Sequence, residues 1–90
     1  MTIQYFAYLR NITGCKEEPW PAEPDVRTLL RSLCEKHGAA LHKKIYIPGS
    51  EDLGDVIIMV NGRHIFHIGG LDAKLCGEDT VQVFPVVAGG

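Results

Sequence analysis

Apolar and polar residues alternate at both ends of the chain, with the period of two that is typical of β-strands. Residues 2–10 read TIQYFAYLR, which predicts a first strand. Its inward face holds Ile3, Tyr5, Ala7 and Leu9, and its outward face holds Thr2, Gln4, Phe6, Tyr8 and Arg10. Residues 80–85 read TVQVFP and predict a last strand, with Val81 and Val83 inward and Thr80, Gln82 and Phe84 outward.

A helical spacing of apolar residues follows the first strand and predicts a helix near residues 25–37. The members of this apolar stripe are Val26, Leu29, Leu30, Leu33 and Cys34. Asp25 is an appropriate N-cap and Gly38 an appropriate stop. The segment before the helix, residues 11–24, contains Gly14 and three prolines, and we expect it to form turns and loop.

In the middle of the chain, the sequence predicts a buried strand followed by a turn. VIIMV at 56–60 is apolar on both faces, which predicts a strand in the interior of the sheet. Asn61-Gly62 predicts a hairpin turn, followed by a return strand over 64–68. Leu71 and Leu75 are expected to pack a loop onto the core, and residues 77–79 to form a turn. Residues 39–55 leave two alternatives open: a helical turn through Ile45, or a short strand over 45–47, before an exposed loop.

This order of elements predicts one α+β domain, a roll in which a mixed sheet packs on one main helix. A chain of 90 residues is the length of a single domain, and 46% apolar with 22% charged residues is an ordinary globular composition. Nine basic against eleven acidic residues give a net charge of −2, which makes nucleic acid an improbable main partner.

The composition also excludes other classes of protein. The longest uninterrupted apolar runs, five residues at 5–9 and at 56–60, are far too short to span a membrane, and the N-terminal residues carry no secretory signal pattern. Three widely spaced cysteines without a CxxC motif predict reduced thiols in a cytoplasmic protein.

Candidate catalytic and metal-binding groups are few. There is no phosphate-binding glycine motif. His64 and His67 are placed on opposite faces of the return strand, so we expect no metal site. Cys34 is expected to be packed and inert and Cys15 to lie in a loop, whereas the sequence allows Cys76 to be either packed or exposed. We therefore expect no stand-alone active site.

The last six residues, Pro85-Val86-Val87-Ala88-Gly89-Gly90, are small and apolar and directly follow the predicted last strand. Two terminal glycines without a Cβ fit a narrow channel in a partner. The only reactive group there is the α-carboxylate of Gly90. The alternative is a frayed terminus without a role.

An exposed aromatic patch is expected beside this tail. Phe6 and Tyr8 lie on the outward face of the first strand and Phe84 on that of the last. If those strands are neighbours, the three rings form a contiguous partner-binding surface. The alternative is that a loop covers them.

Three segments carry a resemblance to a known family: YFAYLRNITG (5–14), MVNGR (59–63) and LCGEDTVQVFPVVAGG (75–90). They resemble the MoaD/ThiS family of ubiquitin-like sulfur carriers, and within it the small subunit of molybdopterin synthase. The resemblance implies a ubiquitin-like β-grasp fold over residues 1–84, followed by a flexible Gly-Gly tail over 85–90.

The resemblance also implies a chemistry for Gly90. An E1-like enzyme uses ATP to adenylate the carboxylate, and a sulfur donor protein then displaces AMP to leave a thiocarboxylate. The tail, with Val87, Ala88 and Gly89, enters the large subunit of molybdopterin synthase and delivers sulfur to a pterin precursor. In the family, aromatic residues at the positions of Phe6 and Phe84 contact the large subunit, as the predicted patch of Phe6, Tyr8 and Phe84 would suggest. This chain would bind no cofactor itself and would be a non-catalytic subunit.

Two departures qualify the resemblance. Val86 stands where the family often has a second proline, and residues 38–55 are longer than in a minimal carrier. Three other functions stay open: a protein modifier joined to lysines through Gly90, a sulfur carrier for thiamine, tungsten cofactor or cysteine synthesis, and a pure binding module.

Overall fold

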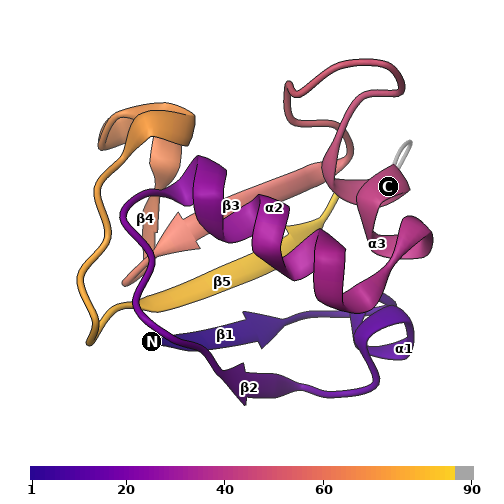
Figure 1. The fold of residues 1–90 in the computed structure, drawn as a ribbon, viewed down its shortest axis with the longest axis horizontal. Helices are drawn as coiled ribbons and strands as arrows, with labels where there is room; N and C mark the ends of the chain where they lie inside the picture. Colours follow the sequence, from indigo (N-terminus) through magenta and orange to yellow (C-terminus); the bar gives the residue numbers. More distant parts are fainter. Residues whose placement is uncertain (87–90) are drawn as a thin grey trace.

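The computed structural model describes residues 1–86 and contains one mixed five-stranded sheet (Figure 1). Its strands are β1 (Thr2–Tyr5), β2 (Glu17–Pro19), β3 (Val56–Val60), β4 (Arg63–His64) and β5 (Thr80–Pro85). Their order across the sheet is β2-β1-β5-β3-β4. β1 and β5 are parallel, and the other neighbouring strands are antiparallel. The last strand is therefore inserted between the first strand and the third.

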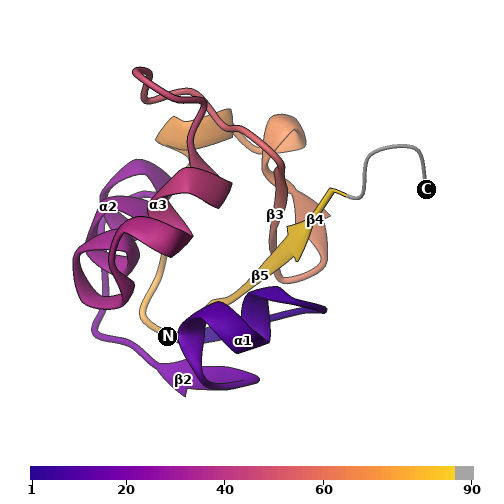
Figure 2. The ribbon, with the colours of Figure 1, turned by 90° about the vertical axis from the view of Figure 1, so that its right-hand side faces the viewer.

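Helix α2 (Val26–His37) packs on one face of this sheet, as Figure 2 shows from the side. The Asp25 side chain accepts a hydrogen bond from the Thr28 N–H at 2.8 Å, which caps the first turn. Gly38 ends the helix with a φ of 88°, a conformation that favours glycine. The predicted helix over 25–37, its N-cap and its stop are confirmed.

The core lies between α2 and the inward face of the sheet. Val81 is paired with Ile3 on one side and Val60 on the other, and Val83 with Tyr5 and Ile58. All of these residues are buried, together with the apolar stripe of α2. The α+β roll and the inward positions of Val81 and Val83 are thus confirmed, and β3 is an interior strand as predicted.

The predicted strand over 2–10 is too long. β1 ends at Tyr5, and the backbone turns at Ala7, whose φ is 53°. Helix α1 (Leu9–Thr13) follows, so Leu9 reaches the core from a helix and Tyr8 precedes that helix. The prediction that Ala7 faces inward is wrong, because Ala7 is exposed at this turn, and Leu9 is buried by the helix that follows. The predicted loop over 11–24 is wrong in part, since it contains the rest of α1 and the edge strand β2.

Residues 39–45 form a third helix, α3 (Ala39–Ile45), which settles the alternative left open by the sequence in favour of a helix. Tyr46 makes only an isolated bridge to Leu53. The predicted Asn61-Gly62 turn is confirmed: β3 and β4 pair antiparallel around it, with positive φ at both residues.

The return strand over 64–68 is shorter than predicted. β4 ends at His64 and continues as the 3₁₀ turn η1 (Ile65–His67). The opposite-face placement of His64 and His67 is wrong, because this turn brings their ring centroids to 6.2 Å. A second 3₁₀ turn, η2 (Gly70–Asp72), precedes the segment in which Leu75 is buried, as expected. No helix within residues 1–86 has the length and hydropathy to cross a membrane.

Candidate functional site

Phe6 and Phe84 form a stacked pair on the outward face of the sheet. Their ring centroids lie 4.2 Å apart with an angle of 12° between the planes. The pair exists because β1 and β5 are parallel neighbours, and the Phe6 N–H donates to the Val83 carbonyl at 3.1 Å. The sequence-based hypothesis that these strands bring the two rings together is confirmed. Both residues are half-buried, so no loop within residues 1–86 covers them completely.

The apolar surface continues onto β3. Ile57 is paired with Phe84, so the two side chains lie on the same face. Met59 lies one step further along that face of β3, and both residues are half-buried. Sequence analysis missed them because VIIMV appeared buried on both faces. Because side chains alternate along a strand, Ile57 and Met59 lie on the opposite face from Val56, Ile58 and Val60. The sequence does not show that this face is the one shared with Phe84. We call Phe6, Phe84, Ile57 and Met59 the sheet patch.

A basic edge lies beside Phe6. The Arg10 guanidinium carbon is 5.6 Å from the centre of the Phe6 ring, within the range of a cation–π interaction. Its Nε donates to the Tyr5 carbonyl at 2.9 Å, so the side chain is held at the end of β1. Lys16 and Glu17 line the same shallow hollow, whose volume is about 270 Å³. The sheet patch is therefore an apolar surface with fixed positive charge at one edge.

Contrary to the prediction, Tyr8 is not part of this surface. Because the backbone turns at Ala7, Tyr8 packs partly against the core. Its ring lies 5.2 Å from the Lys44 ammonium of α3. Among residues 1–86, its ring makes no aromatic contact with Phe6 or Phe84. The strand-based reason for including Tyr8 is wrong, although a role in partner binding stays a prediction.

The sheet patch lies where β5 leads towards the C-terminal sequence. Pro85 is still paired with Val56, and the Val86 N–H donates to the Asp55 carbonyl at 2.9 Å. The Val86 side chain is 44% exposed. The predicted functional residues Val87, Ala88, Gly89 and Gly90 lie outside the described residues.

The thiols and imidazoles of residues 1–86 form no metal centre. No group of three or more histidine, cysteine, aspartate or glutamate side chains in this range is arranged to hold a metal ion. Cys34 is buried, and burial raises the pKa of its thiol to about 11, which makes it unreactive near neutral pH. Cys15 is half-buried and Cys76 exposed. Among the described residues, the sheet patch is therefore the candidate functional surface.

One buried polar cluster was missed by the sequence analysis. Glu18, only 7% exposed, points inward from the edge strand β2. It accepts hydrogen bonds from the Tyr5 hydroxyl at 2.6 Å and from the Lys36 ammonium, and its Oε2 lies 2.6 Å from His37 Nε2. Burial raises the pKa of the Tyr5 phenol, and Glu18 adds to that effect, so Tyr5 stays a donor. The cluster joins β1, β2 and the end of α2.

Comparison with known proteins identifies the family. The ThiS family matches this chain over residues 3–90. The chain belongs to the ThiS family. It is a ubiquitin-like protein of the family that includes sulfur carriers and small protein modifiers, and its fold is the ubiquitin-like β-grasp.

Three relatives show how far the similarity extends. Small archaeal modifier protein 3 of Haloferax volcanii is 33% identical over 92 residues, with 100% of this chain and 98% of that protein covered. The solution structure of small archaeal modifier protein 1 from Methanosarcina acetivorans has a TM-score of 0.87 at 34% identity, covering 99% of this chain and 94% of that one. A putative molybdopterin converting factor, subunit 1, from Pyrococcus furiosus has a TM-score of 0.73 at 34% identity, covering 96% and 95%.

Proposed function

We propose that this protein is a sulfur carrier whose Gly90 carboxylate is adenylated by an E1-like enzyme and converted to a thiocarboxylate. We propose further that it donates this sulfur as the small subunit of molybdopterin synthase. One observation carries the proposal: Phe6 stacks on Phe84 to form a half-exposed apolar surface, and Phe84 lies on the strand that leads to the Gly-Gly sequence.

The chemistry explains why such a chain needs partners. A carboxylate resists nucleophilic attack because its negative charge is delocalised. ATP converts the Gly90 carboxylate into an acyl-adenylate with release of pyrophosphate. Hydrosulfide delivered by a sulfur donor protein then attacks the acyl carbon, so that the C–S bond forms as the C–O bond to AMP breaks. The C-terminal thiocarboxylate is held on a tether, and tethering replaces diffusion of free sulfide by a high effective concentration.

In this proposal the sheet patch docks onto the partner and directs the tail into it. Phe6 and Phe84 supply the apolar contact, and Arg10 adds a charge at the edge. Val87, Ala88, Gly89 and Gly90 would enter the active site of the large subunit or of the activating enzyme. Small side chains and two glycines suit a narrow channel.

The molybdopterin branch is supported by the similarity to the putative converting factor subunit, which extends over nearly the whole of both chains.

The proposed compartment is the cytoplasm. The wide spacing of Cys15, Cys34 and Cys76 supports a reducing compartment.

A second candidate is a protein modifier, joined to lysines of other proteins through Gly90. It is favoured by the two small archaeal modifier proteins, which are as similar to this chain as the converting factor subunit is. Both candidates share the adenylation step, so they differ only in the acceptor that attacks the activated carboxyl.

Mass spectrometry tests the proposal. The full chain is incubated with its E1-like enzyme, ATP and a sulfur source, and a gain of about 16 Da, oxygen replaced by sulfur, is expected at Gly90. A variant lacking Gly90 should fold normally and gain nothing. An unmodified chain, under conditions that load a control carrier, would contradict the proposal. Peptides from cell extracts in which Gly90 is joined to a lysine would instead establish the modifier function.

A further inference from the structure

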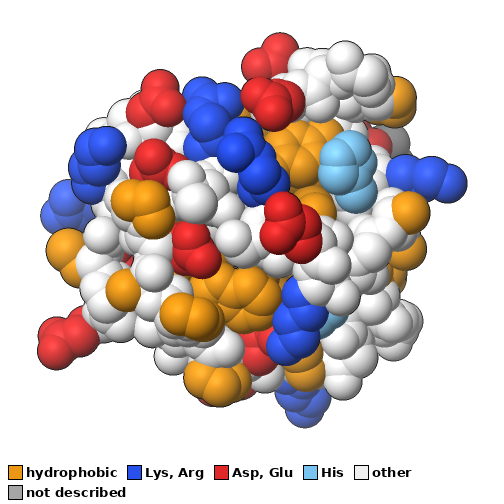
Figure 3. Space-filling model, viewed as in Figure 1, with side chains coloured by type: hydrophobic (Ala, Val, Ile, Leu, Met, Phe, Trp, Pro, Cys, Tyr) orange, Lys and Arg blue, Asp and Glu red, His pale blue; other side chains and the backbone are white. Residues whose placement is uncertain are grey.

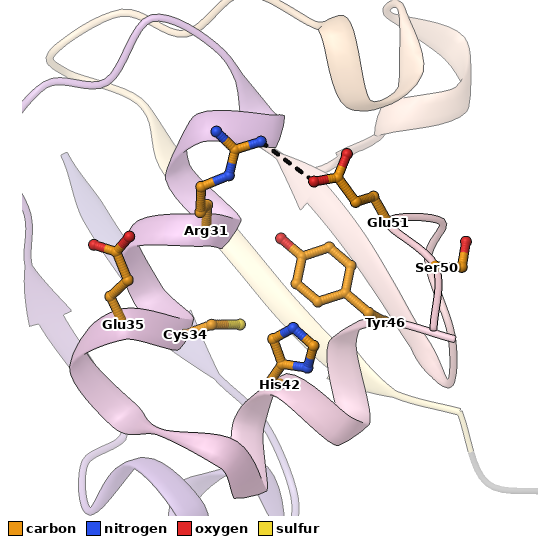
Figure 4. Close-up of a pocket in the computed structure, with 7 residues that line it drawn as sticks. All are labelled: Arg31, Cys34, Glu35, His42, Tyr46, Ser50 and Glu51. Carbon is orange, nitrogen blue, oxygen red and sulfur yellow. Dashed lines mark ion pairs between the residues drawn. The ribbon is translucent and has the colours of Figure 1, made fainter. Parts of the chain in front are cut away.

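A second hollow lies on the opposite side of the molecule from the sheet patch, where the helices cover the sheet. It has a volume of about 230 Å³ and opens between α2, α3 and the loop that follows α3 (Figure 4). The residues that line it are Arg31, Cys34, Glu35, His42, Tyr46, Ser50 and Glu51. We call it the helix pocket. Its volume suits a single side chain, since pockets for drug-sized ligands are larger.

The wall of the helix pocket is built by the segment whose role the sequence analysis left open. The loop is closed on itself, because the Ile47 N–H donates to the Asp52 carbonyl at 3.0 Å and the Gly54 N–H to the Ile45 carbonyl at 2.7 Å. A Cβ at Gly54 would lie 3.0 Å from the Tyr46 backbone, so glycine permits this close approach. The Arg31 guanidinium then ties the loop to α2 through Glu51 at 3.5 Å.

The floor of the helix pocket is uncharged. Cys34 and the Tyr46 ring lie at its centre in Figure 4, and the His42 ring packs against Tyr46 with centroids 4.9 Å apart. Burial raises the pKa of the Cys34 thiol and of the Tyr46 phenol, so both groups stay protonated near neutral pH. An apolar stem can therefore lie on a thiol and an aromatic face.

The rim carries more negative than positive charge. It has one guanidinium, on Arg31, and two carboxylates, on Glu35 and Glu51. Arg31 is already paired with Glu51, and Glu35 forms no ion pair within residues 1–86. Figure 3 shows an apolar spot on this face with acidic side chains above and below it, basic ones on one side and a histidine on the other. An aromatic face also attracts cations.

We propose that the helix pocket binds a basic side chain, lysine or arginine, of a partner protein. The aliphatic stem lies on Tyr46 and Cys34, and the cationic head reaches Glu35 and Glu51. Because the pocket lies away from Phe6 and Phe84, the proposal is independent of the sulfur-carrier function. It gives residues 39–54 a role as a second recognition surface that stays accessible when the sheet patch is covered.

The test is an NMR titration of the isotope-labelled full chain with three capped amino acids. N-acetyl-lysine N-methylamide is expected to shift the amide signals of Arg31, Cys34, Tyr46 and Ser50, and less so in high salt. The norleucine derivative, of nearly the same length but without charge, and the glutamate derivative are expected to bind more weakly. Equal shifts with all three, or shifts that do not map to the helix pocket, would overturn the proposal.

Two variants with opposite expected effects sharpen the test. Glu35→Gln removes a carboxylate and should weaken lysine binding by roughly two- to fivefold, the range of an exposed ion pair. Arg31→Gln frees Glu51 from its ion pair and should tighten lysine binding by about the same factor. Glu78→Gln, at an exposed glutamate outside the pocket, is the matched control and should change nothing. Weaker lysine binding or tighter glutamate binding in the Arg31 variant would show that the pocket does not select cations.

Discussion

At the scale of single residues, Glu18 determines much of how β2 is attached to the rest of the fold. A carboxylate on the inward face of an edge strand is costly unless it is compensated. Here three donors, on Tyr5, Lys36 and His37, surround it. The inward-pointing charge also makes the short edge strand a poor template for pairing with another chain.

We expect Glu18→Gln to lower the free energy of unfolding by roughly 2–4 kcal/mol, because the cationic and hydroxyl donors lose a charged acceptor in a buried site. Urea denaturation measures this value. Glu17→Gln, on the exposed side of the same strand, is the control and should stay within about 0.5 kcal/mol of the parent. Equal losses in the two variants would mean that the buried cluster adds nothing.

The same residue predicts an acid-dependent loss of stability. Burial by itself would raise the pKa of Glu18, but the hydrogen bonds from Lys36, Tyr5 and His37 together outweigh it and lower that pKa below its ordinary value of 4.5. A group with a lowered folded-state pKa stabilises the protein above its unfolded pKa, and this stability is lost as the pH falls through the folded value. We therefore expect the melting temperature, measured from pH 6 down to pH 2, to fall more steeply below about pH 4.5 in the parent than in Glu18→Gln. Parallel curves would refute this linkage.

At the scale of elements, the two faces of β5 have different surroundings. Val81 and Val83 fill the core, and Phe84 faces outward beside Phe6. The alternation was readable from TVQVFP. The neighbours of β5 were not, because a parallel pairing between residues almost eighty positions apart leaves no local signal.

The two faces of β5 predict different responses to a charge. Val83→Asp places an unpaired carboxylate in the core and should prevent folding, with a loss of more than about 4 kcal/mol. Val86→Asp introduces the same charge at an exposed position just after the strand and should cost less than about 1 kcal/mol. Circular dichroism and thermal melts distinguish these outcomes, and a folded, stable Val83→Asp variant would refute the assignment of the core face.

At the scale of the whole molecule, the two surfaces that we propose for recognition lie apart. The sheet patch lies on the open face of the sheet, and the helix pocket lies across the core between α2, α3 and the following loop. A small chain can in this way contact one partner through its sheet and another through its helices.

This separation predicts how partner binding responds to mutation. Phe84→Ala or Phe6→Asp should weaken binding to the proposed large subunit at least tenfold, because a half-exposed apolar anchor is lost. The stability should stay within roughly 1 kcal/mol, as at other surface positions. Glu35→Gln, in the helix pocket, should leave this binding unchanged. Calorimetric titration measures the affinity, and a large drop in melting temperature for Phe84→Ala would show that the ring belongs to the core.

The sequence by itself determined the local features of this protein. The helical stripe with Asp25 and Gly38 fixed α2, the Asn61-Gly62 pair fixed the hairpin, and alternation separated Val83 from Phe84. Each depends on residues a few positions apart, so its pattern can be read along the chain. The tertiary structure alone decided that β1 ends at Tyr5, that Glu18 is buried, that Phe6 stacks on Phe84 and that Tyr46 lies under Arg31 and Glu51. Those features depend on packing between segments that are distant in the sequence, and a local pattern of apolar and polar residues does not predict such packing.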